Sequence, residues 1–136
     1  MIRTRSFAHD RNSVTEARHF VAELVSDYPS ALAEAAVLLT SELATNAIRH
    51  AGQAFSVRVE TTAEQLRVEV TDAGEGQPMP RSPQTLESSG RGLQIVESLS
   101  DEWGVARVGP GKTVWFSLHV SHVGYQSRDG AATFDS

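Results

Sequence analysis

The sequence predicts an α+β fold built around a single hydrophobic core. Segments with apolar residues at helical spacing come before Gly52, and alternation with a period of two takes over after it. At 136 residues, the chain is long enough for one core and too short for two comfortable ones. We therefore expect one domain over residues 1–123, followed by a polar C-terminal tail over residues 124–136 that frays.

The N-terminal part is predicted to hold one strand and two helices. A short strand is expected over residues 4–9, and a first helix over residues 14–26. Pro29 suits the start of a second helix, which we expect over residues 30–50. Apolar residues recur in this second helix at intervals of three and four, and they form a stripe that should face the core: Leu32, Ala36, Leu39, Leu43 and Ala47.

The next two strands form a predicted hairpin that ends in an acid. Apolar and polar residues alternate over residues 55–60 and 66–71, on either side of a turn near Ala63. One further step of the same alternation places Asp72 on the core-facing side, at the end of the second strand. An ionised carboxylate there is costly without a hydrogen-bond partner, and the amino group of adenine would be a suitable partner.

Two glycines, Gly74 and Gly76, follow this acid closely. Glycines remove side chains where the backbone must turn close to a ligand, so residues 72–76 fit a site that reads a base. The same residues also fit a turn acid followed by turn glycines, and the motif alone favours neither interpretation.

A polar pair lies in the second predicted helix. Glu42 and Asn46 are four residues apart, so they are neighbours on one helical face. The amide oxygen of Asn46 suits Mg²⁺, which prefers hard oxygen ligands, and Glu42 could take a proton from a hydroxyl group or from water. The solvated side of an amphipathic helix has the same pattern, and for this pair alone it is the favoured interpretation.

A third element, Gly90-Arg91-Gly92-Leu93, opens a predicted helix that continues to Leu99. It follows residues 77–89, which hold three prolines and should form an irregular loop. Free N–H groups at a helix N-terminus attract anions, glycines let a phosphate approach, and Arg91 could add charge-assisted contacts. A loop-to-helix hinge with an exposed arginine fits the same residues equally well.

Two more strands are expected over residues 103–108 and 113–120. Between them, Gly111-Lys112-Thr113 resembles the end of a Walker A loop. Ala106, however, stands where that loop requires a glycine, and a strand follows where a helix is required. We therefore exclude a P-loop.

Composition narrows the function classes. The chain has no cysteine, which excludes disulfides and thiolate chemistry and fits a reducing cytoplasm. The formal net charge is −5 and the arginines are scattered, which argues against sequence-independent nucleic-acid binding. No run approaches membrane-spanning length, so we expect a soluble, cytoplasmic protein without membrane or nucleic-acid partners.

The order of these motifs resembles that of the Bergerat-fold (GHKL) ATPases. Residues 41–51 and 90–105 are most similar to the anti-sigma-factor serine/threonine kinase branch, which includes small actinobacterial ATP-binding regulatory proteins. The resemblance covers the chain to about Val120. It implies the histidine-kinase-like ATPase fold, a two-layer α/β sandwich in which one mixed, mostly antiparallel sheet carries helices on one face.

The resemblance also implies a role for each motif, with ATP and Mg²⁺ as cofactors. Asn46 would hold Mg²⁺, Glu42 would be the catalytic base, and Asp72 would bind the adenine amino group. Thr113 would support Asp72 through its hydroxyl or a water, and Arg91 and Lys112 would lie near phosphate. The glycines would frame the nucleotide and its lid, namely Gly74, Gly76, Gly90 and Gly92, and Leu93 is a further implied cofactor-binding residue.

The activity implied by the resemblance is that of a serine/threonine protein kinase. Its substrate would be an anti-anti-sigma (STAS-type) protein, and it would regulate transcription by partner switching. A sigma factor is a second implied partner, and a homodimer is allowed. Two alternatives remain open at this point: a catalytically silent switch, in which ATP controls affinity for a protein partner, and a stand-alone ATPase.

Overall fold

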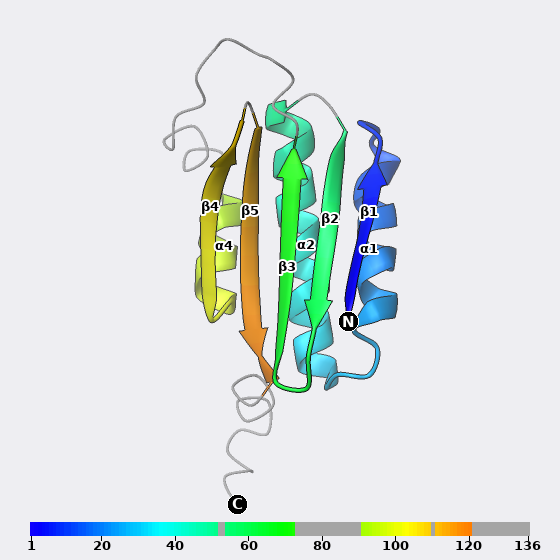
Figure 1. The fold of residues 1–136 in the computed structure, drawn as a ribbon, viewed down its shortest axis with the longest axis vertical. Helices are drawn as coiled ribbons and strands as arrows, with labels where there is room; N and C mark the ends of the chain where they lie inside the picture. The colour runs from blue at the N-terminus through cyan, green and yellow to red at the C-terminus, as the bar shows by residue number, and fades with distance from the viewer. Residues whose placement is uncertain (52–53, 73–90, 110, 121–136) are drawn as a thin grey trace, which may run out of the picture.

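The protein is a two-layer α/β sandwich (Figure 1). The computed structural model describes residues 1–51, 54–72, 91–109 and 111–120. Within them the strands form one five-stranded sheet in the order β1-β2-β3-β5-β4, and the helices cover one of its faces. The elements are β1 (Ile2–Phe7), α1 (Asn12–Leu24), α2 (Ser30–Ala51), β2 (Phe55–Thr61), β3 (Gln65–Asp72), α4 (Arg91–Leu99), β4 (Glu102–Val108) and β5 (Gly111–His119).

The predicted fold class is confirmed, with one refinement. Every strand pairing in the described sheet is antiparallel, whereas a mixed, mostly antiparallel sheet was expected. The hairpin β2–β3 is paired in register from Phe55 opposite Asp72 to Thr61 opposite Leu66. The central strand β3 therefore has β2 on one side and β5 on the other.

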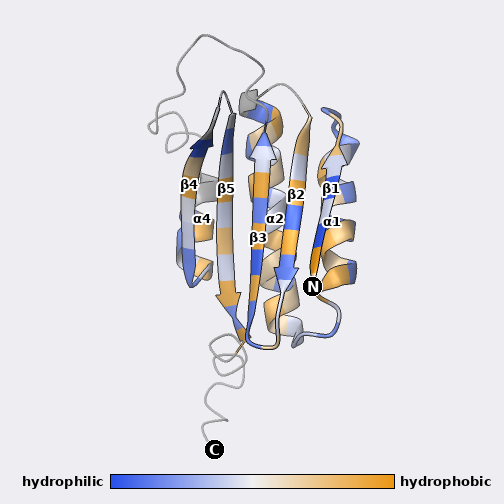
Figure 2. Cartoon of the chain, in the orientation of Figure 1, coloured by the Kyte–Doolittle hydropathy of each residue, from blue (hydrophilic) through white to orange (hydrophobic). Residues whose placement is uncertain are grey.

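The core lies between the sheet and the helices, and α2 makes up much of its helical side. The predicted stripe of this helix is buried throughout: Leu32, Ala36, Leu39, Leu43 and Ala47. On β3, the inward residues Leu66, Val68 and Val70 are buried as well, and Figure 2 shows the resulting alternation of apolar and polar bands along the strand. The apolar stripe of α2 thus packs on the apolar side of β3, as is usual where an amphipathic helix covers a half-buried sheet.

Helix α2 also contains a long apolar stretch. Its segment Ser30–Arg49 is long and apolar enough, by length and composition, to cross a membrane, so the expectation that no run reaches that length was wrong. In the fold its apolar stripe packs on the sheet, and α2 contacts β2, β3 and β5. Packing in the core accounts for this hydropathy.

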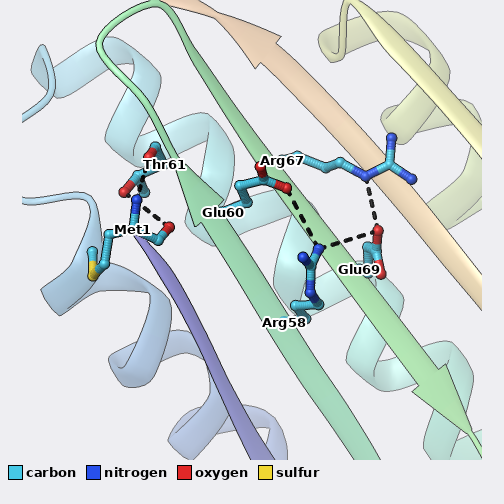
Figure 3. A network of polar contacts seen from close by, with 6 residues as sticks. All are labelled: Met1, Arg58, Glu60, Thr61, Arg67 and Glu69. Atoms are coloured by element: carbon cyan, nitrogen blue, oxygen red, sulfur yellow. Dashed lines mark hydrogen bonds and ion pairs between the residues drawn. The ribbon is translucent and has the colours of Figure 1, made fainter.

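The face of the sheet opposite the helices carries charged side chains. Arg58 lies 3.5 Å from Glu60 and 3.6 Å from Glu69, and the side chain of Arg67 donates to Glu69 at 2.9 Å (Figure 3). Nearby, the N-terminal ammonium of Met1 donates to the carbonyl oxygen of Thr61 and ties β1 to the end of β2. These pairs are partly exposed, so each contributes little to stability, about 0–1 kcal/mol.

Candidate functional site

Asp72 lies at the end of β3, where the alternation predicted it. It is paired with Phe55 of β2 and with Lys112 of β5. It shares its side of the strand with the buried residues of β3 and is itself only 5% exposed. A carboxylate is thus held at the helix-covered face of the sheet, where it requires polar partners.

A partner that the sequence did not indicate is Lys112. Its Nζ donates to Oδ2 of Asp72 at 2.7 Å, and the two side chains are 7% and 5% exposed. Lys112 was expected near phosphate, but its ammonium group contacts the acid that was expected to read the base. A clue was present in β5: the apolar residues Val114, Phe116 and Leu118 alternate, and Lys112 shares their core-facing side.

The same alternation puts Thr113 on the other face. Its hydroxyl lies 2.7 Å from the hydroxyl of Thr71, the residue opposite it on β3. The expected direct hydroxyl contact with Asp72 is therefore not formed, because neighbouring residues of a strand point to opposite sides of the sheet. Thr113 instead joins β3 to β5 just behind Asp72.

Asn46 brings a buried amide to α2. The residue is 6% exposed, and its Nδ2 has no hydrogen-bond partner among the residues that the structure describes. Glu42, one helical turn earlier, is only partly buried. A buried amide donor without a partner costs free energy, and an oxygen-rich ligand or a water would satisfy it.

These residues also fit a magnesium ion that is shared with a nucleotide. The described part of the chain contains no cluster of three or more histidine, cysteine or acidic residues that could hold a metal by itself. Mg²⁺ is often bound by one or two protein oxygens together with substrate phosphates and waters. The amide oxygen of Asn46 is an oxygen donor of that kind, and Glu42, one turn earlier, remains free to act as a base.

The fold brings the polar groups of α2 and β3 to the same end of the sandwich. The C-terminal part of α2, which carries Asn46, lies at the end where β3 finishes and β5 begins (Figure 1). The helix packs directly on both strands. His9 holds this last part of α2, because its Nε2 donates to the carbonyl oxygen of Ile48 at 3.1 Å.

The other predicted nucleotide-binding residues are only partly covered by the structure. Gly74, Gly76 and Gly90 lie outside the described residues, as do the predicted loop at 77–89 and the predicted tail at 124–136. Arg91, Gly92 and Leu93 form the first turn of α4, as their sequence predicted. The roles assigned to these residues stay predictions.

Comparison with known proteins gives a family match over most of the chain. The family model described as "Histidine kinase-like ATPase domain" matches residues 7–118, which is most of the chain. The matched range contains Glu42, Asn46, Asp72 and Thr113. A search of curated proteins found no match to the chain.

Proposed function

This chain belongs to the family of histidine kinase-like ATPase domains, and we propose that it is an ATP-binding serine/threonine protein kinase. Its proposed substrate is an anti-anti-sigma protein of the STAS type, and its proposed role is to regulate transcription by partner switching. The likeness of residues 41–51 and 90–105 to anti-sigma-factor kinases supports this choice of partner.

One observation supports a nucleotide-binding site between Asn46 and Asp72. The unpartnered amide of Asn46 is buried in the part of α2 that lies at the same end of the sandwich as the carboxylate of Asp72. A nucleotide between them would satisfy both groups: its amino group would donate to Asp72, and its phosphate region would bring oxygen atoms to Asn46. Mg²⁺, bound by Asn46 and the phosphates, would neutralise charge on the transferred group.

Glu42 is the proposed base of the transfer step. In that step the hydroxyl oxygen of a partner serine or threonine attacks the γ-phosphorus of ATP, and the bond from that phosphorus to the bridging oxygen breaks to release ADP. Glu42 takes the hydroxyl proton. Its position supports this role, because it is one turn from Asn46 and only partly buried, so an approaching hydroxyl group can reach it.

Transfer of labelled phosphate tests the proposal. Wild-type protein, ATP, Mg²⁺ and a STAS-type partner should give a partner labelled on serine or threonine. Glu42→Gln should lower this rate at least a hundredfold and leave ATP affinity within about threefold, since base catalysis contributes about 10²–10⁴-fold. Glu34→Gln is the matched control, because Glu34 is an exposed glutamate on the same helix, and it should transfer like wild type.

Each result separates the candidate functions. If the wild type binds ATP, and ATP changes its affinity for the partner without any transfer, the protein is an ATP-dependent switch and the kinase proposal is wrong. If phosphate is transferred only to water, it is a stand-alone ATPase. If neither ATP nor its analogues bind, the nucleotide site itself is refuted.

A further inference from the structure

The buried ion pair at the end of β3 adds a cation to the proposed nucleotide site. Lys112 and Asp72 face each other across β5 and β3, with their charged atoms 2.7 Å apart. Both side chains are almost completely removed from solvent. Any ligand that reaches the carboxylate of Asp72 on this side of the sheet also meets the ammonium group of Lys112.

Both Lys112 and Asp72 have hydrogen-bonding positions that their mutual contact does not use. An ammonium group has three donors, and among the described residues Lys112 uses one of them, on Asp72. A carboxylate has about four acceptor positions, so one bond from Lys112 leaves room for a ligand amino group. A buried charge with unused hydrogen-bonding capacity is costly, and a ligand that supplies a donor and an acceptor side by side would lower that cost.

We propose that Lys112 reads the nucleobase together with Asp72. The inference rests on the proposed ATP-binding function. Asp72 accepts a hydrogen bond from the 6-amino group of adenine, and Lys112 donates to one of the two ring nitrogens that flank it, N1 or N7. The pair thus recognises both the 6-amino group, a donor, and the neighbouring ring nitrogen, an acceptor. An acid alone would recognise only the amino group and would accept more kinds of base.

The competing interpretation is that Lys112 serves only as the counterion of Asp72. In that case the ammonium and the amino group of the base compete for the same carboxylate. Removing the ammonium would then improve binding of ATP, and no ring nitrogen would matter to affinity. The two interpretations predict opposite results for the same variant.

Deaza analogues of ATP give a direct test. We would measure dissociation constants for ATP, 1-deaza-ATP and 7-deaza-ATP, in which N1 or N7 is replaced by C–H. Wild type should bind one of the two analogues at least about tenfold more weakly than ATP, because a hydrogen bond from a charged donor is lost. In Lys112→Met, ATP affinity should fall by a similar factor, and that analogue should bind within about twofold of ATP.

Arg58→Met is the matched control. It removes a cation from the neighbouring strand β2, but on the helix-free face of the sheet, where Arg58 pairs with Glu60 and Glu69. Its affinities for the three nucleotides should equal those of wild type. Lys112→Arg keeps the charge and the donors, so it should keep the sensitivity to the same analogue.

The outcomes are decisive in both directions. Equal binding of all three nucleotides by wild type, an analogue effect that persists in Lys112→Met, or tighter ATP binding by Lys112→Met overturns the inference. Failure of wild type to bind ATP refutes the proposed function instead. If thermal melting shows that Lys112→Met is unfolded, Lys112→Gln takes its place with the same expectation, since a neutral amide is a weaker donor than an ammonium group.

Discussion

The pair formed by Asp72 and Lys112 should behave as a buried ion pair in unfolding experiments without nucleotide. The change we consider is Asp72→Asn, Lys112→Met and the double variant. Because the side chains are 5% and 7% exposed, removing either one leaves the other charge inside the protein without its counterion. Each single variant should therefore lose about 3–5 kcal/mol of unfolding free energy.

The double variant should regain most of this loss. It contains no buried charge at this position, and replacing both members of a buried pair by neutral groups is often neutral or stabilising. We expect its unfolding free energy to lie within about 1 kcal/mol of wild type, although each single change is severe. The strong coupling between the two changes would follow from the contact of 2.7 Å between Nζ and Oδ2.

Urea titration followed by circular dichroism measures all four proteins. A domain of ordinary stability has about 5–15 kcal/mol in total, so the single variants should show clearly lower midpoints at an unchanged slope. Arg58→Met provides the comparison with an exposed pair. Its side chain is 35% exposed and lies 3.6 Å from Glu69, so it should cost less than about 1 kcal/mol.

If both single variants stayed within about 1 kcal/mol of wild type, Asp72 and Lys112 would not form a buried ion pair, since that is the behaviour of a solvated pair. The assignment of a buried ion pair would also be refuted if the double variant were as unstable as the worse single variant. In that case the lost stability would come from packing and not from unpaired charge.

Two further changes probe the packing of the fold away from the site. Tyr28→Phe should cost about 1 kcal/mol at neutral pH, because the hydroxyl donates to the carbonyl oxygen of Thr62 at 2.6 Å. Burial raises the pKa of Tyr28 above its ordinary value, so the contribution of the neutral hydroxyl is present below that ordinary value and is lost as the pH rises through the folded-state pKa. Urea titrations at neutral and strongly alkaline pH should therefore show the difference between the two proteins shrinking, and a constant difference would contradict this. Gly104→Ala should lower the unfolding free energy by about 1–3 kcal/mol and change the tryptophan emission, because an added Cβ would lie 2.9 Å from Nε1 of Trp115. An unchanged urea midpoint would contradict the close packing of that ring on β4.

Much of the fold could be predicted from local patterns. The stripe of α2 is buried as predicted, and the alternation along β3 correctly turned Asp72 toward the core. Both results follow from geometry within one element. In a helix, side chains three or four residues apart share a face, and in a strand, alternate residues share a side. Element ends were less well predicted, since β1 begins at Ile2 and α1 at Asn12, ahead of the expected starts at residues 4 and 14.

Only the tertiary structure showed which residues contact the site residues. Lys112 and Asp72 are separated by 40 residues in the chain, and only the register of β5 against β3 brings their charges together. That register also pairs Thr113 with Thr71 on the opposite face, where it does not contact the acid directly.

By itself, the sequence determined which residues face the core, because side-chain periodicity is a property of a few neighbouring residues, and it predicted the motifs of a nucleotide site. The tertiary structure decided which of those residues meet. Strand register and the burial of Asn46 depend on how the whole sheet packs against α2, and no short stretch of sequence contains that information.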